Sequence, residues 1–244
     1  MRKILITIIT IFILFGCSKN RLAKDMPVER KMEIGNTFFE KGKYHKAIPY
    51  FTDVAFERNS IYTAEAQMKL ADCYFNQNKF MEARFEYEEL IRLFHDYKEV
   101  SRAYLQIGIC YLNESLNPHY TQEETEKAIS AFVTFIEKFP FDEKKKDAIE
   151  YIQKCHYKLL EKKYYNGYAY YKMCDYSAAL MYFNDIISLG NIDEIDKMSL
   201  YYSARIYITR KDKENALLAS NKLNERYPGS KEANKINTLI KKLD

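Results

Sequence analysis

Residues 34–51 read IGNTFFEKGKYHKAIPYF, and this stretch decides the fold. A small residue, Gly35, is followed three places later by an aromatic residue, then by a Gly-Lys-Tyr segment, and then by Ala47 with a second aromatic residue four places beyond it. Residues 70–87, LADCYFNQNKFMEARFEY, repeat this order. Further copies start around Gly108, Gly167 and Ala204. Such self-similarity predicts a chain of repeated helix pairs.

The spacing has a physical reason. Two antiparallel helices approach closely where each presents a small side chain, so we expect Gly35 to face Ala47, with aromatic side chains filling the wedge beside that contact. A proline ends a helix because it lacks the amide hydrogen that a further turn needs, as at Pro140 and Pro228. The pattern resembles the tetratricopeptide repeat.

The sequence therefore predicts an all-α tetratricopeptide-repeat solenoid of about five helix pairs. The predicted repeats span Val28–Phe56, Ala64–Phe94, Ser101–Phe139, Leu160–Leu189 and Lys197–Pro228. The interval between Gly108 and Gly167 is longer than the others, because a loop at 113–125 is inserted and a long helix within 142–172 joins repeats three and four. We divide the repeats into an N-terminal group, 28–141, and a C-terminal group, 142–244.

The N-terminus has the composition of a secretion signal. Arg2 and Lys3 precede an apolar run at 4–15 that is too short to span a membrane. Leu14-Phe15-Gly16-Cys17 resembles a lipobox, so we expect residues 1–16 to be a signal peptide, Cys17 to carry acyl chains such as palmitate, and 17–27 to be a linker. The alternative is an uncleaved N-terminal anchor with an incidental cysteine.

Charge and composition exclude several classes of function. The formal net charge is only +4, and the signs are interspersed, so we expect no binding to nucleic acid. No arrangement of residues for nucleophilic, phosphate-binding or metal-dependent catalysis is present, which predicts a protein that is no enzyme and has no metal or cofactor. Cys73, Cys110, Cys155 and Cys174 lie in apolar helical pattern, and we expect buried free thiols rather than disulfides.

The first helices of repeats one and two offer a candidate groove for client peptides. Successive first helices line the concave face of such repeats, and aromatic, amide and carboxylate groups there would suit an extended peptide. The groove residues are Met32, Asn36 and Phe39 in repeat one and Met68, Asp72 and Phe75 in repeat two. The alternative is that any of these side chains only packs against a neighbouring helix.

Repeat four offers a second candidate surface. Tyr164, Tyr168 and Tyr171 share one helix face, and we place Tyr201 and Arg205 of repeat five beside them. Tyrosine and arginine are enriched at interfaces, so this set is predicted to bind a folded partner. The chain has 22 tyrosines, and several must serve the core instead.

The lipobox, five repeats, the loop in repeat three and the long helix together resemble the BamD family, lipoproteins of the outer-membrane β-barrel assembly machinery. This resemblance implies a lipid anchor at the periplasmic face of the outer membrane. It also implies two kinds of partner: unfolded outer-membrane proteins, and the periplasmic domain of the barrel-forming assembly subunit. The alternatives are a generic scaffold that coordinates other envelope proteins, and a glycan-binding lipoprotein, whose large non-repeat half this chain lacks.

Overall fold

A computed structural model describes residues 26–57 and 60–242, and in these ranges every regular element is a helix. The helices are α2 (Val28–Glu40), α3 (Tyr44–Ala55), α4 (Thr63–Asn76), α5 (Phe80–Leu93), α6 (Val100–Glu114), α7 (Glu123–Lys138), α8 (Lys145–Lys172), α9 (Tyr176–Ser188), α10 (Glu194–Thr209), α11 (Lys213–Arg226) and α12 (Lys231–Ile240). The prediction of an all-α tetratricopeptide-repeat solenoid is confirmed. Cys17 and the predicted signal peptide lie outside the described residues.

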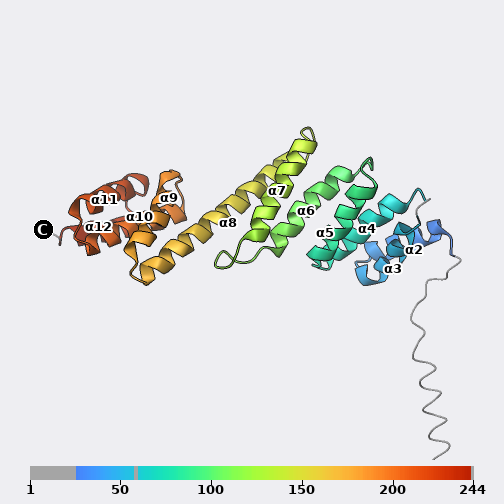
Figure 1. Ribbon diagram of the computed structural model, residues 1–244, viewed down its shortest axis with the longest axis horizontal. Coiled ribbons are helices and arrows are strands. Elements are labelled where there is room, and N and C mark those ends of the chain that lie inside the picture. The colour runs from blue at the N-terminus through green and yellow to red at the C-terminus, as the bar shows by residue number, and fades with distance from the viewer. Residues whose placement is uncertain (1–25, 58–59, 243–244) are drawn as a thin grey trace, which may run out of the picture. The chain divides into compact units, whose positions relative to one another are not determined.

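The chain forms two compact units that divide between Ile107 and Gly108, inside α6. In the first unit α2 pairs with α3 and α4 with α5, and α3 packs against α4 (Figure 1). Its core contains the fully buried Phe51 and the half-buried Phe39. The boundary predicted from the sequence, after residue 141, separates two functional groups of repeats, and that functional division stays a prediction.

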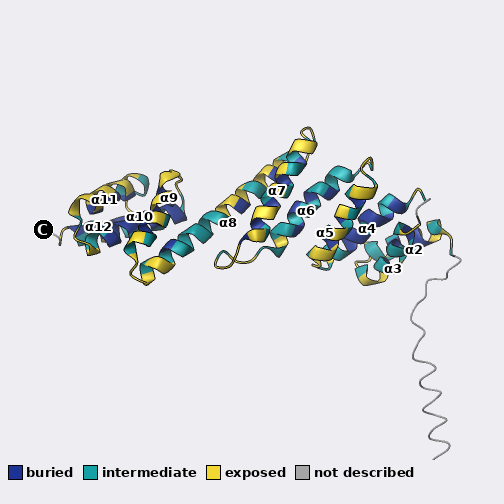
Figure 2. Ribbon diagram, viewed as in Figure 1, coloured by how far each residue is buried: buried dark blue, intermediate teal, exposed yellow. Residues whose placement is uncertain are grey.

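The second unit contains the long helix α8, which packs on both α7 and α9 and so joins repeats three and four. The ring of Phe132 on α7 stacks on Tyr151 near the start of α8, with 5.1 Å between ring centroids. Near the other end of α8, Gly167 lies against Phe183 of α9. Figure 2 shows the buried faces turned toward neighbouring helices and the exposed faces along the outside of α9 and α11. Helix α12, which the sequence analysis did not predict, packs on α10 and α11 and contributes the buried Ile236.

The small residue of a first helix lies against the second aromatic residue of its helix pair. A Cβ added at Gly35 would lie 2.7 Å from Cε1 of Phe51, and the three atoms nearest to it all belong to the Phe51 ring. The same relation holds for Gly108 with Phe132, at 2.5 Å. The glycine therefore makes room for an aromatic ring, and the predicted contact between Gly35 and Ala47 stays a prediction.

One turn geometry connects the two helices of repeats one, two, four and five. The second residue after each first helix has a positive φ: Gly42, Asn78, Cys174 and Lys211, between 58° and 66°. The left-handed conformation of this residue lets the backbone amides that follow donate hydrogen bonds to carbonyl groups in the last turn of the helix. An example is the bond from Asp175 N to Tyr170 O. The prediction that Cys174 is buried is wrong, because this turn exposes it. The other three described cysteines are buried and form no disulfide, as predicted.

Candidate functional site

The six predicted groove residues separate into two sets by burial. Met32, Met68 and Asp72 are buried and belong to the packing between helices. Asn36, Phe39 and Phe75 are half-buried and keep some contact with solvent. Of the six, these last three are the ones that a peptide could reach without repacking of the helices.

Asp72 is engaged inside the protein. Its Oδ1 accepts hydrogen bonds from the Tyr87 hydroxyl at 2.7 Å and from Arg102 Nη1 at 2.8 Å, and its Oδ2 accepts from Arg102 Nη2 at 2.9 Å. Burial lowers the pKa of Arg102, but the hydrogen bonds and charge of Asp72 outweigh this effect and raise that pKa. Such a bidentate pair is strong and directional. Asp72 therefore links α4 to α5 and to the start of α6, and its carboxylate is not spare for a peptide backbone.

Phe39 lies in an aromatic group that a lysine covers. Its ring meets Tyr44 edge-on at 5.3 Å and Phe51 at 6.3 Å between centroids, and Lys69 Nζ lies 4.5 Å from the centre of the Phe39 ring. The buried Oδ1 of Asn36 on the same helix accepts no hydrogen bond from any residue within 26–57 and 60–242. Sequence reasoning missed Lys69, although it follows Met68 directly. The first-helix face of the first unit thus combines apolar rings, an amide and an ammonium group.

The predicted tyrosine face is brought together in the second unit. Tyr164 stacks near Tyr168 at 6.3 Å, and Tyr168 near Tyr171 at 6.2 Å, so the three tyrosines of α8 form a continuous row. The guanidinium carbon of Arg205 lies 5.7 Å from the centres of both the Tyr171 and Tyr201 rings. Tyr201 is buried, whereas the other four residues of this set are half-buried. All five therefore lie in one side-chain cluster.

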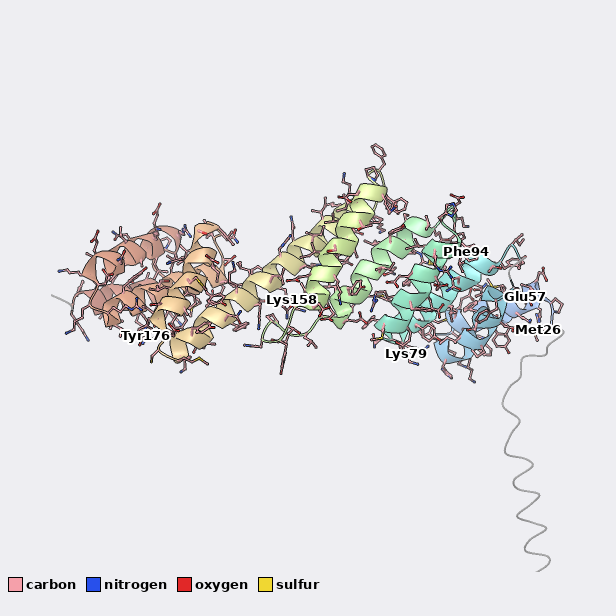
Figure 3. The ribbon with its side chains drawn as sticks, viewed as in Figure 1. Met26, Glu57, Lys79, Phe94, Lys158 and Tyr176 are labelled. Carbon is pink, nitrogen blue, oxygen red and sulfur yellow. The ribbon has the colours of Figure 1, made fainter. Side chains whose placement is uncertain are left out.

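Tyr202 completes this cluster and was missed from the sequence. Its ring lies 4.8 Å from that of Tyr171 and 5.1 Å from that of Tyr168, measured between centroids. Burial raises the pKa of Tyr202 to about 12, so its hydroxyl stays protonated. Tyr176, at the start of α9, adds a further ring 6.1 Å from Tyr171 (Figure 3). Tyr202 could have been identified from the sequence, because it precedes Arg205 by three residues and residues three apart on a helix share one face.

A separate groove in the first unit is lined by residues of α3 and α5 and by α4 from Thr63 to Tyr74. We call it the α3–α5 groove, and its volume is about 750 Å³. Its lining residues are Thr52, Ala55, Phe56, Thr63, Gln67, Leu70, Tyr74, Phe85, Glu86, Glu89, Arg92, Leu93 and Phe94. None of the six predicted groove residues is among them. The sequence analysis missed this groove because residues from three helices form it.

Neither a cluster of metal ligands nor a membrane-spanning helix occurs in the described ranges. Across residues 26–57 and 60–242, no three His, Cys, Asp or Glu side chains come together as metal ligands. Over the same part of the chain, no helix combines the length and the apolar character that a membrane crossing requires.

Comparison with known proteins places the chain near one family. A family model described as an outer membrane lipoprotein, YfiO, matches residues 24–188, and a tetratricopeptide-repeat model matches residues 198–230. The outer membrane protein assembly factor BamD of Caulobacter vibrioides is 23% identical over 211 residues. That alignment covers 85% of this chain and 68% of the Caulobacter protein.

Solved structures with similar folds are repeat proteins. The TPR2AB domain of yeast Sti1 is 15% identical, with a TM-score of 0.47, and the match covers 88% of this chain and 83% of that one. A tetratricopeptide repeat protein from Parabacteroides merdae is also 15% identical, with a TM-score of 0.38, and the match covers 88% of this chain and 74% of that one.

Proposed function

This chain belongs to the YfiO, or BamD-type, family of outer membrane lipoproteins, and from that premise we propose that it is a subunit of the β-barrel assembly machinery. In this role it binds unfolded outer-membrane proteins and the periplasmic domain of the barrel-forming assembly subunit. The observation that carries the proposal is the family match over residues 24–188. The role of the Caulobacter relative, outer membrane protein assembly, agrees with it.

The proposed location is the periplasmic face of the outer membrane, with acyl chains on Cys17 as the anchor. Acyl chains hold a protein at a membrane without a spanning helix. Mass spectrometry of the membrane-extracted protein should find residues 1–16 absent and a lipid mass on Cys17. A soluble, unmodified protein with a different N-terminus would contradict this part of the proposal.

The proposed client site is the first-helix face of the first unit. Phe39 and Phe75 supply apolar rings, Asn36 supplies a half-buried amide side chain, and Lys69 supplies a positive charge. An extended peptide that ends in an aromatic residue offers complementary groups: a ring, backbone amides and a terminal carboxylate. The buried Met32, Met68 and Asp72 support this face from within.

The proposed partner face is the tyrosine cluster of the second unit. Tyrosine presents a large, rigid surface at low cost in conformational entropy, and arginine stacks on aromatic rings. Tyr164, Tyr168 and Tyr171, with Tyr201 and Arg205, supply this combination on α8 and α10. Such anchors suit a folded domain better than a client that varies in sequence.

Paired variants separate the two sites. The double variant Phe39→Ala/Phe75→Ala should weaken binding of an aromatic-ended client peptide by about 5- to 100-fold, and leave binding of the barrel subunit's periplasmic domain unchanged. Tyr168→Ala/Arg205→Ala should do the reverse. Because Phe39 and Tyr168 are half-buried, Lys69→Gln and Arg205→Gln serve as milder variants that keep the packing. If either double variant abolishes both interactions in a folded protein, the two-site division is wrong.

A further inference from the structure

The α3–α5 groove carries an apolar surface that no element in the described part of the first unit covers. Three of its lining residues are large, apolar and well exposed: Phe56 at 80%, Phe85 at 59% and Leu93 at 49%. Figure 3 labels Phe94, which lines the groove at the C-terminal end of α5, and Glu57, which follows Phe56 after α3. Clustered exposed rings beside a concave surface are typical of sites where another polypeptide binds.

The groove also holds one carboxylate, Glu86, that pairs with no cation among the residues that the structure describes. Glu89 is paired with Arg92, whose Nε lies 3.0 Å from Glu89 Oε1, so these two charges neutralise each other. Glu86 is half-buried, and the side-chain amide of Gln67 donates to its Oε2 at 2.6 Å. Burial raises the pKa of Glu86, the Gln67 hydrogen bond opposes this rise, and the nearby charge of Glu89 adds to it. The ionised carboxylate is therefore incompletely compensated inside the groove.

We propose that the α3–α5 groove binds a partner polypeptide segment in which a lysine or arginine is flanked by apolar side chains. The cation pairs with Glu86, and the apolar side chains lie on Phe85, Leu93 and Phe56. Charge complementarity selects this partner, because an acidic segment would place a second negative charge beside Glu86 and leave both poorly solvated. The groove is separate from the client residues of α2 and α4, so this inference does not depend on the client site.

The size of the groove sets the length of the segment. The lining residues of α5 and its C-cap run from Phe85 to Phe94, about 13 Å along a helix axis. About four residues of extended chain cover this distance. A ten-residue peptide therefore fills the groove with residues to spare at both ends.

The test uses the full chain and two labelled peptides of ten residues. Both carry leucine and phenylalanine on either side of a central position, which is arginine in one peptide and glutamate in the other. Fluorescence anisotropy should show that the arginine peptide binds at least about tenfold more tightly, because a charge-assisted hydrogen bond forms with Glu86. Added salt should reduce this difference.

Matched variants locate the site. Glu86→Gln should weaken binding of the arginine peptide about tenfold, whereas Glu88→Gln should leave it unchanged. Glu88 is an exposed carboxylate of the same helix that does not line the groove. Both variants remove one negative charge, so only the position of that charge differs between them. Phe85→Ala should weaken binding, and the matched variant Phe141→Ala should not, because Phe141 is 99% exposed in the second unit, far along the chain from the groove.

Three outcomes would overturn the proposal. Equal affinity for the two peptides would show that the charge of the central residue does not select the partner. An equal effect of Glu86→Gln and Glu88→Gln would show that the peptide does not bind at Glu86 in the groove. If the double variant Phe39→Ala/Phe75→Ala no longer bound the arginine peptide while Phe85→Ala bound it fully, the peptide would lie in the client site instead.

Discussion

Gly108 shows how closely the helices of one repeat approach each other. A Cβ at this position would lie 2.5 Å from Cε1 and 2.6 Å from Cδ1 of Phe132. Phe132 is fully buried and stacks on Tyr151, so its ring has little freedom to move away. Gly35 stands in the same relation to Phe51, and Gly167 to Phe183. The small residue of the repeat is therefore a steric requirement rather than a helix preference.

We accordingly predict that Gly108→Ala lowers the free energy of unfolding by about 1–3 kcal/mol, because the added methyl group overpacks the core. Urea denaturation followed by circular dichroism measures this change. Ser130→Ala, an exposed change on the facing helix α7, is the control and should have little effect. If Gly108→Ala unfolds at the urea concentration of the unmodified protein, the close approach to Phe132 is wrong.

Cysteine reactivity gives a second prediction for single residues. Burial, together with the negative charge of Asp72, raises the pKa of Cys73 to about 12, and burial also raises the pKa of Cys155. At pH 8 only about one Cys73 in ten thousand is a thiolate, the reactive form. Cys174 is exposed in the turn before α9. Iodoacetamide should therefore modify Cys174 in the native protein, while Cys73 reacts only after unfolding.

Peptide mapping of the alkylated protein checks this expectation. Cys174→Ser should remove the native-state label, and urea should expose all four cysteines of the described part of the chain. Equal native rates at Cys73 and Cys174 would contradict the burial of Cys73.

The loop between α6 and α7, residues 115–122, is an organised element of the second unit. Gln122 is buried, and its Nε2 lies 3.0–3.3 Å from the carbonyl oxygens of Leu116, Asn117, Tyr120 and Thr121. An amide nitrogen has only two hydrogens, so these four acceptors share them. The loop is thus folded around one side chain.

Helix α8 holds this loop from outside. Lys158 Nζ donates to the carbonyl oxygen of Ser115 at 3.1 Å, and Lys162 Nζ donates to that of His119 at 3.0 Å (Figure 3). Burial lowers the pKa of Lys158. The His119 ring lies 3.9 Å from the Tyr165 ring, measured between centroids. These contacts attach the inserted loop to the long helix that follows it.

Removal of the central amide should open the loop. Gln122→Ala leaves buried carbonyl groups without a donor, at a cost of about 1–3 kcal/mol each for those that water cannot reach. Hydrogen–deuterium exchange should become faster in residues 115–122, and Lys158→Met should give a smaller effect in the same residues. Lys146→Met, an exposed change on α8, is the control. Unchanged exchange in Gln122→Ala would mean that the loop does not depend on this side chain.

The elements also show what the sequence could predict. The repeats were predictable because Gly35, Ala71 and their equivalents recur with aromatic residues at fixed distances. Helix α12 was not predictable, because its buried positions hold Ala233, Ile236 and Ile240 and none of the aromatic residues that mark the repeat. Asp72 could be assigned to the first helix of repeat two, but its buried pairing with Arg102, 30 residues away in the sequence, could not be predicted. Long-range pairs of this kind, and the α3–α5 groove, depend on packing that periodicity does not encode.

For the whole molecule, stability is distributed over two units with separate cores. The core of the first unit includes Phe51 and Val54, and that of the second includes Phe183 and Leu223. In repeat proteins each repeat contacts mainly its neighbours, so stability is a sum of local terms. Terminal elements with a polar outer face cap the end of such a stack. Helix α12 fits this role, because Ile236 is buried against α10 and α11 whereas Lys231 and Lys235 are exposed.

A truncated side chain in the cap should therefore destabilise one end of the chain and not the other. Ile236→Ala removes a fully buried side chain, at an expected cost of about 2–5 kcal/mol to the second unit. Hydrogen–deuterium exchange with mass spectrometry should show lost protection in α10, α11 and α12, and protection close to that of the unmodified protein in α2 and α3. Thr238→Ala, an exposed change on the same helix, should alter neither region. Equal loss of protection at both ends in Ile236→Ala would show that the chain unfolds as one cooperative block, and the local additivity argued from its two cores would then be wrong.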